Sequence, residues 1–100
     1  MFGLKPNDLQ VIVDIIKLYP QIEEAIVFGS RALDKYKKGS DIDIALKGEN
    51  VEAVTAEVAG LLNDESPLPY YFDIIDYNTI DNADLRDHID RVGKQIYKKL

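Results

Sequence analysis

The sequence predicts an α/β (α+β) fold in which a small mixed sheet of three to four strands is flanked by helices. Segments of helical and of strand periodicity alternate along the 100 residues, and the series begins and ends with a helix. Glycine, proline and serine separate these segments, and no linker, repeat or low-complexity tract interrupts them. We therefore expect residues 1–100 to form a single domain around one hydrophobic core.

The composition narrows the class of protein. A content of 46% hydrophobic and 30% charged residues is typical of a globular protein. The absence of cysteine excludes disulfides, thiolate metal sites and cysteine nucleophiles. No apolar run is long enough to span a membrane, and we expect a soluble cytoplasmic protein. The net charge of −6 argues against direct binding to nucleic acid, which depends on clustered cations.

The first half of the chain begins with an amphipathic helix. Its apolar residues recur on one face from a cap at Asn7 or Asp8 until Pro20 ends the run. Residues 25–28 form a short apolar run of strand-forming residues. A brief helix is expected at residues 31–33, directly after this strand.

The second half continues the alternation. Apolar and polar residues alternate at 41–46, which indicates a strand, and helical spacing follows at 51–62. Two prolines precede a third strand at 70–75. The last helix is expected to begin near Asn82 and to end at Gly93, before a short apolar segment and a basic tail.

Two aspartates lie two residues apart in the strand at 41–46. Because a strand rises about 3.3 Å per residue and its side chains alternate faces, Asp41 and Asp43 should lie about 7 Å apart on one face. Ile42 and Ile44 should then face the core. Like charges this close repel, and a bound cation relieves the repulsion; carboxylate oxygens suit Mg²⁺ or Mn²⁺. Alone, the pattern also fits a solvated sheet face.

A third carboxylate follows the same logic on another strand. Phe72 and Ile74 are expected to face the core, which turns Asp73 to the opposite face. Asp76 shares the parity of the two core residues and therefore ranks second. Three aspartates on one face of adjacent strands form a pocket suited to two divalent ions, which lie about 3.5–4 Å apart in such sites.

A Gly-Ser pair ends the strand at 25–28. Gly29 lets the backbone approach a ligand closely, N–H groups at a helix start attract phosphate, and Ser30 adds a hydroxyl donor. Alone, the pair also fits a strand-to-helix turn with a serine cap. Four cations then lead toward the acidic pair: Arg31, Lys35, Lys37 and Lys38. The occurrence of all three features within residues 29–43 favours a phosphate site.

These residues resemble a family signature. Gly29-Ser30, ten intervening residues and then Asp41-Ile42-Asp43 are similar to the Gly-Ser-x10-Asp-x-Asp signature of the DNA polymerase β-like nucleotidyltransferases. Phe-Gly-Ser-Arg-Ala at 28–32 and Ser-Asp-Ile-Asp-Ile-Ala at 40–45 resemble, more narrowly, the minimal nucleotidyltransferases (MNT), which include antitoxins paired with HEPN-domain toxins. Asp73 matches the third carboxylate of that family, and the segment after Gly93 resembles its usual ending.

The resemblance implies a polymerase β-like nucleotidyltransferase fold and the metal-dependent transfer of a nucleoside monophosphate, AMP from ATP, to an acceptor hydroxyl. The catalytic carboxylates, which would also ligate two Mg²⁺ or Mn²⁺ ions, are Asp41, Asp43 and Asp73. The nucleotide-binding residues would be Gly29, Ser30, Arg31 and Ser40. The expected partner is a HEPN-domain toxin in a hetero-oligomer, and adenylylation of a toxin tyrosine would make this chain an antitoxin.

Two further positions carry expectations. Asp34 stands where the family usually has a second glycine after the Arg-Ala pair. Because aspartate tolerates left-handed backbone conformations better than most residues, we expect the turn to survive. The single histidine, His88, lies in a polar helical stretch, and we expect neither a metal-ligand nor a catalytic role for it.

Two other functions also fit the sequence. A non-catalytic regulatory module would neutralise a HEPN partner by contact alone. A metal-binding or structural domain would use the acidic face without affinity for a triphosphate. The three aspartates favour an enzyme over the first function, and the Gly-Ser turn at the family spacing favours it over the second.

Overall fold

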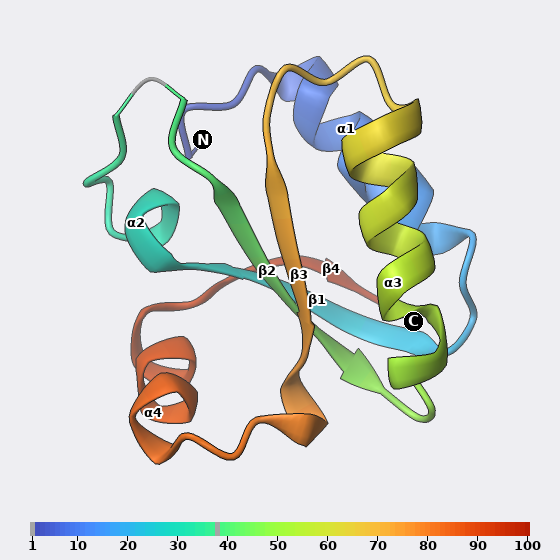
Figure 1. Cartoon of the computed structure of the whole chain (residues 1–100), viewed down its shortest axis with the longest axis vertical. Coiled ribbons are helices and arrows are strands. Elements are labelled where there is room, and N and C mark those ends of the chain that lie inside the picture. Colours follow the sequence, from blue (N-terminus) through green and yellow to red (C-terminus); the bar gives the residue numbers. More distant parts are fainter. Residues whose placement is uncertain (1, 38) are drawn as a thin grey trace.

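A computed structural model describes residues 2–37 and 39–100. Its centre is a four-stranded sheet in the order β3-β2-β1-β4 (Figure 1). The strands are β1 (Ile22–Phe28), β2 (Ile42–Gly48), β3 (Phe72–Asp76) and β4 (Lys94–Lys98). β1 pairs antiparallel with β2 and β4, whereas β3 runs parallel to β2. The predicted mixed sheet flanked by helices is confirmed.

Helices cover both faces of this sheet. α1 and α3 lie together on one face, and α4 lies on the other side, near the short α2 (Figure 1). The helices are α1 (Pro6–Lys17), α2 (Gly29–Ala32), α3 (Glu52–Gly60) and α4 (Ala83–Val92). A π-helical turn, Leu61–Glu65, continues α3. Within the described residues, no helix combines the length and apolar character that crossing a membrane requires.

Each face of the sheet has its own hydrophobic core. The larger core contains residues of α1, α3 and three strands, among them Ile16, Val58 and Ile44, all fully buried. The smaller core joins Ile26 and Ala45 of the sheet to α4. Full burial of one large aliphatic side chain contributes about 1.5–3 kcal/mol, so the larger core holds α1 and α3 in place. The smaller core does the same for α4.

Several boundaries differ from those predicted. α1 begins at Pro6 instead of being capped by Asn7 or Asp8, because proline has a fixed φ that suits the first helical turn and lacks an N–H there. β1 starts at Ile22, earlier than the apolar run suggested, because Glu24 pairs with the neighbouring strands despite its charge. The apolar segment near the end is part of β4, which pairs with β1.

The predicted boundaries of the last helix are confirmed. The side chain of Asn82 caps α4 by accepting hydrogen bonds from the backbone N–H groups of Asp84, at 2.9 Å, and Leu85, at 3.2 Å. Gly93 follows the last helical residue. A Cβ at Gly93 would collide with the carbonyl of Ile89 and with Ile26, so glycine permits the close passage from α4 into β4.

Asn63 fixes the outer edge of β3. Its side-chain nitrogen donates to the carbonyl of Phe72 at 2.9 Å, and its side-chain oxygen accepts from the N–H of Phe72 at 2.7 Å. β3 is an edge strand, and these two groups would otherwise lack a neighbouring strand. The π-helical turn after α3 therefore sets the position of Phe72 and of the residue that follows it, Asp73.

We expect Asn63→Ala to lower the free energy of unfolding by about 2 kcal/mol, because two part-buried backbone groups lose their partner. Urea unfolding followed by circular dichroism measures this. Asp64→Ala alters the exposed neighbouring residue and should cost less than about 0.5 kcal/mol. Equal stability of the two variants would contradict the role given to Asn63.

Candidate functional site

The candidate site is built on the parallel pair of β2 and β3. The register pairs Asp43 directly with Asp73. Paired residues of neighbouring strands project from the same face, so the two carboxylates lie side by side. Asp43 has the parity of Ala45, and Asp73 has that of Ile75, both of which belong to the smaller core. The carboxylates therefore project on the side of the sheet that α4 covers.

The parity predicted for the third strand is confirmed. Phe72 and Ile74 are buried in the larger core, whereas Asp73 is exposed. Asp76 is buried and accepts a hydrogen bond at 2.9 Å from the N–H of Asn78 at the start of a 3₁₀ turn. Asp76 therefore points to the opposite face of the sheet and stabilises the turn after β3. Asp73 is the residue that lies beside Asp43.

Asp41 lies just before β2 and is exposed. Within residues 2–37 and 39–100, no three histidine, aspartate or glutamate side chains converge closely enough to hold a metal ion as the side chains stand. The structure thus brings Asp43 and Asp73 together and places Asp41 at the entry of the same strand. The role of Asp41 as a metal ligand stays a prediction.

The surroundings of Asp43 disfavour its charged form. Burial raises the pKa of Asp43 above its usual 3.8, and the neighbouring carboxylates of Asp73 and Asp41 raise it further. His88, in its charged form, lowers it. A divalent cation beside these oxygens would relieve both the repulsion and the lost hydration, and hard oxygen donors suit Mg²⁺ or Mn²⁺. The donor set therefore fits the predicted metal.

Gly29 lies directly against Asp43. The register of β1 and β2 pairs Phe28 with Asp43, so the chain turns into α2 beside the carboxylate. Gly29 has φ +71°, and a Cβ there would collide with the Asp43 carboxylate. Glycine is thus required for both backbone conformation and space. The next residue, half-buried Ser30, follows within the same turn.

The predicted nucleotide ligand Arg31 is buried, with 3% of its surface exposed. Its guanidinium donates to the carbonyls of Phe2, at 3.0 Å, and Ser40, at 2.8 Å. It also lies over the rings of Tyr36 and Tyr70, at 4.7 and 5.6 Å. Arg31 therefore ties the N-terminal segment to the loop before β2. A contact of Arg31 with phosphate stays a prediction.

The loop before β2 keeps the turn expected from the sequence. Asp34 has φ +56°, which confirms that aspartate adopts the left-handed conformation at the position where the family has glycine. The hydroxyl of Ser40 accepts from the N–H of Lys37 at 2.7 Å, so this predicted nucleotide ligand closes the loop. Lys35 and Lys37 are exposed, whereas Lys38 lies outside the described residues.

His88, for which neither a metal-ligand nor a catalytic role was expected, has a contact with the candidate site that was not predicted from the sequence. Its Nε2 atom accepts a hydrogen bond from the N–H of Gly29 at 3.1 Å, and its ring packs edge-on against Phe28 with centroids 6.2 Å apart. A signal was present, because His88 follows Leu85 by three residues and so falls on the inner face of α4. The polar neighbours in sequence obscured that spacing.

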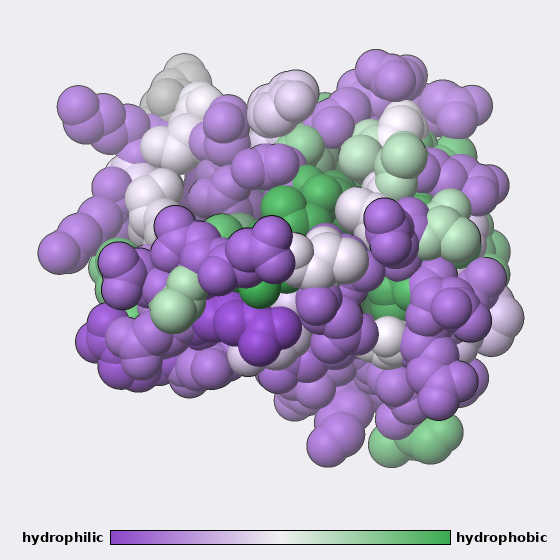
Figure 2. Space-filling view, turned by 60° about the horizontal axis from the view of Figure 1, so that its bottom comes forward, coloured by the Kyte–Doolittle hydropathy of each residue, from purple (hydrophilic) through white to green (hydrophobic). Residues whose placement is uncertain are grey.

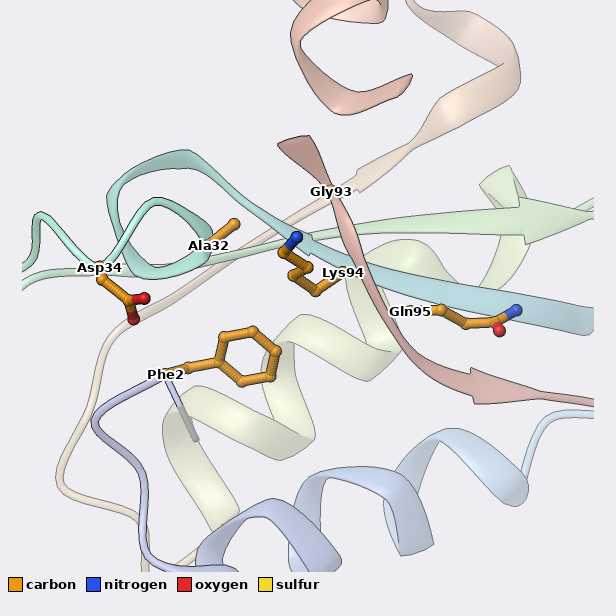
Figure 3. A pocket seen from close by; sticks show the side chains of 6 residues that line it. All are labelled: Phe2, Ala32, Asp34, Gly93, Lys94 and Gln95. Atoms are coloured by element: carbon orange, nitrogen blue, oxygen red, sulfur yellow. The ribbon is translucent and has the colours of Figure 1, made fainter. Parts of the chain in front are cut away.

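The face of the molecule shown in Figure 2 is mainly polar. Figure 2, which brings the lower edge of Figure 1 forward, shows hydrophilic residues with small hydrophobic areas between them. The exposed side of α4 carries a surface ion pair of 2.8 Å between Arg91 and Asp87. A pocket of about 530 Å³ lies elsewhere, between the N-terminal segment, the end of α2 and the start of β4 (Figure 3). Its lining residues, which do not include Asp43 or Asp73, are Phe2, Ala32, Asp34, Gly93, Lys94 and Gln95.

The raised pKa of Asp43 predicts the pH dependence of stability. Because the folded chain holds the proton of Asp43 more tightly than the unfolded chain does, ionisation of Asp43 costs stability as the pH rises from 3.8 through the raised pKa. Asp43→Asn should therefore raise the melting temperature at pH 7, and this gain should vanish below pH 3.8.

Thermal unfolding at several pH values measures this effect. Asp64→Asn, which removes the same charge from an exposed site, serves as the control and should change the melting temperature little at either pH. A melting temperature of Asp43→Asn below that of the unaltered chain at pH 7 would contradict the conclusion that ionised Asp43 destabilises the fold. Added Mg²⁺ should stabilise the unaltered chain more than Asp43→Asn.

Comparisons with known proteins agree with the fold and with the arrangement of the carboxylates described above. The family model described as polymerase beta, nucleotidyltransferase, matches residues 10–100. The comparison with curated proteins found no match. Among solved structures, a toxin–antitoxin complex with AMP-PNP is similar, with a TM-score of 0.72 and 23% identity over 96% of this chain and 75% of the other.

Two further solved structures share the fold. The MntA–HepT toxin–antitoxin complex has a TM-score of 0.71 and 21% identity, over 95% of this chain and 74% of the other. An MNT antitoxin in complex with a tri-AMPylated HEPN toxin from Shewanella oneidensis has a TM-score of 0.70 and 21% identity, over 96% and 74% of the two chains. With the family model matching residues 10–100 and the sheet placing Asp43 beside Asp73, the chain belongs to the polymerase β-like nucleotidyltransferase family.

Proposed function

We propose that this chain is a metal-dependent nucleotidyltransferase that transfers AMP from ATP to a hydroxyl of a HEPN-domain toxin and thereby acts as its antitoxin. The observation that carries the proposal is the direct pairing of Asp43 with Asp73, beside the turn at Gly29. Two neighbouring carboxylates beside a strand-to-helix turn bring metal ligands and hydrogen-bond donors for phosphate to one place.

The residues divide into two groups by role. Asp41, Asp43 and Asp73 would hold two Mg²⁺ ions, and exposed Asp41 would reach the pair by a change of its side-chain rotamer. Bound Mg²⁺ supplies positive charge that stabilises the attacking and leaving oxygens. Gly29 and Ser30 would lie along the β- and γ-phosphates, where the Ser30 hydroxyl donates a hydrogen bond.

The proposed reaction is a nucleophilic displacement at the α-phosphorus of ATP. The acceptor hydroxyl oxygen forms a bond to the α-phosphorus while the bond from that phosphorus to the bridging oxygen breaks, and pyrophosphate leaves. The proton of the hydroxyl passes to the carboxylate of Asp73. Because Asp73 is exposed on the edge strand β3, an acceptor carried by another protein can approach it from solvent. The chain then supplies the nucleotide site, and the partner supplies the acceptor.

The proposed partner rests on the similar structures. They are toxin–antitoxin complexes, one with AMP-PNP and one with a HEPN toxin that is tri-AMPylated. At 21–23% identity they support a shared fold, and the same partner class and modification are the simplest extension to this chain. A HEPN-domain protein is the substrate with which to test the proposal.

We expect Asp73→Asn to lower the rate of AMP transfer to the HEPN partner by at least about 10²-fold, because it removes both a metal ligand and the proton acceptor. Intact-mass spectrometry of the partner, incubated with ATP and Mg²⁺, measures the transfer. Asp64→Asn removes an exposed charge outside the proposed site and should transfer AMP at the unaltered rate.

The same experiment separates the competing functions. A partner that gains AMP groups and loses toxicity supports the enzyme. A partner that is inhibited without any gain in mass supports neutralisation by contact and would refute transfer as the mechanism. Equal rates for Asp73→Asn and Asp64→Asn would refute the role of the paired carboxylates.

A further inference from the structure

His88 connects α4 to the candidate site from a distant part of the sequence. It accepts a hydrogen bond from the N–H of Gly29 at 3.1 Å, across 59 positions of the chain. Its ring meets that of Phe28 edge-on, at an interplanar angle of 78°. The imidazole thus contacts both residues where β1 turns into α2.

The hydrogen bond defines the chemical state of the imidazole. A backbone N–H can only donate, so the accepting Nε2 atom carries a lone pair and the proton of the neutral ring lies on Nδ1. The first N–H groups of a helix lack partners within that helix. His88 satisfies the first of these in α2, which begins at Gly29.

Gly29 is also the residue that touches the carboxylate pair. Its missing side chain leaves the space that the carboxylate of Asp43 occupies, so a small movement of Gly29 changes the distance between the turn and Asp43. Gly29 has a positive φ, which few residues share, and α2 contains only four residues. A turn this short gains its position from external contacts, and the His88 hydrogen bond is one of them.

We infer that His88 is a positioning residue of the nucleotidyltransferase site. It holds the turn at Gly29 and Ser30 against Asp43, so that the phosphate-binding turn and the carboxylates have one fixed geometry before nucleotide binds. It acts through Gly29 and does not touch the substrate. Because this hydrogen bond already satisfies the Gly29 N–H, the phosphate contact of the turn falls to Ser30. The kinetic consequence rests on the proposed function, whereas the hydrogen bond does not.

Three substitutions separate the acceptor from the ring. His88→Phe keeps an aromatic ring against Phe28 but removes the acceptor. His88→Gln can place its amide oxygen where Nε2 lies, and so restores the acceptor. His88→Asn is polar but too short to reach the same point. Asp87→Asn, which changes the exposed neighbouring residue on α4, serves as the matched control.

Two independent measurements follow. Amide hydrogen exchange by NMR reports the Gly29 hydrogen bond directly, and steady-state kinetics with ATP reports the site. In His88→Phe we expect the protection of the Gly29 amide to be lost and KM for ATP to rise about five- to tenfold, the value of one hydrogen bond, with a smaller change in kcat. His88→Gln should recover most of both effects, and Asp87→Asn should match the unaltered chain.

Each result decides the inference. A protected Gly29 amide in His88→Phe, or a His88→Gln variant no better than His88→Phe, would overturn it. If His88→Phe does not fold, His88→Asn replaces it. Unaltered exchange of the Gly29 amide and an unaltered KM in His88→Asn would then overturn the inference. If the unaltered chain transfers no nucleotide, the proposed function fails instead. Positioning is then decided by the amide shifts of Ser30 and Asp43, which must move in His88→Phe and return in His88→Gln.

Discussion

The register between the parallel strands β2 and β3 is the constraint on which the site depends. It sets Asp43 beside Asp73, and a slip of one residue would turn Asp73 into the larger core and expose Phe72. Parallel strands require a crossover, and here α3 provides it. The π-helical turn that follows α3 in this crossover contains Asn63, whose side-chain amide forms hydrogen bonds with both backbone groups of Phe72. The same connection that buries α3 against the sheet therefore fixes where the second carboxylate lies.

The two faces of the sheet perform different tasks. The face beneath α1 and α3 carries most of the buried hydrophobic residues. The face beneath α4 is apolar only in part, and it gives way to Asp43 and Asp73 at the end where β1 turns into α2. There, burial and neighbouring carboxylates raise the pKa of Asp43. An electrostatic cost of this kind is a common feature of functional sites.

Much of this site could be predicted from the sequence, because its main elements are local. Alternation along one strand separated Asp73 from its apolar neighbours, and backbone preference predicted that Asp34 would keep the left-handed turn. What could not be predicted depends on contacts between distant segments. β4 has only a weak apolar pattern and is defined by its pairing with β1. His88 and Asn63 act through backbone groups 59 and 9 positions away, and polar side chains of this kind carry no periodic signal for a distant partner.

A crystal structure of the chain with a non-hydrolysable ATP analogue and Mn²⁺, in which anomalous scattering locates the metal, tests the proposed carboxylate site most directly. We expect Mn²⁺ within coordination distance of carboxylate oxygens of Asp43 and Asp73, with the β- and γ-phosphates against Ser30. Mn²⁺ bound away from both carboxylates, or an analogue bound in the pocket between Phe2 and Lys94, would contradict this expectation.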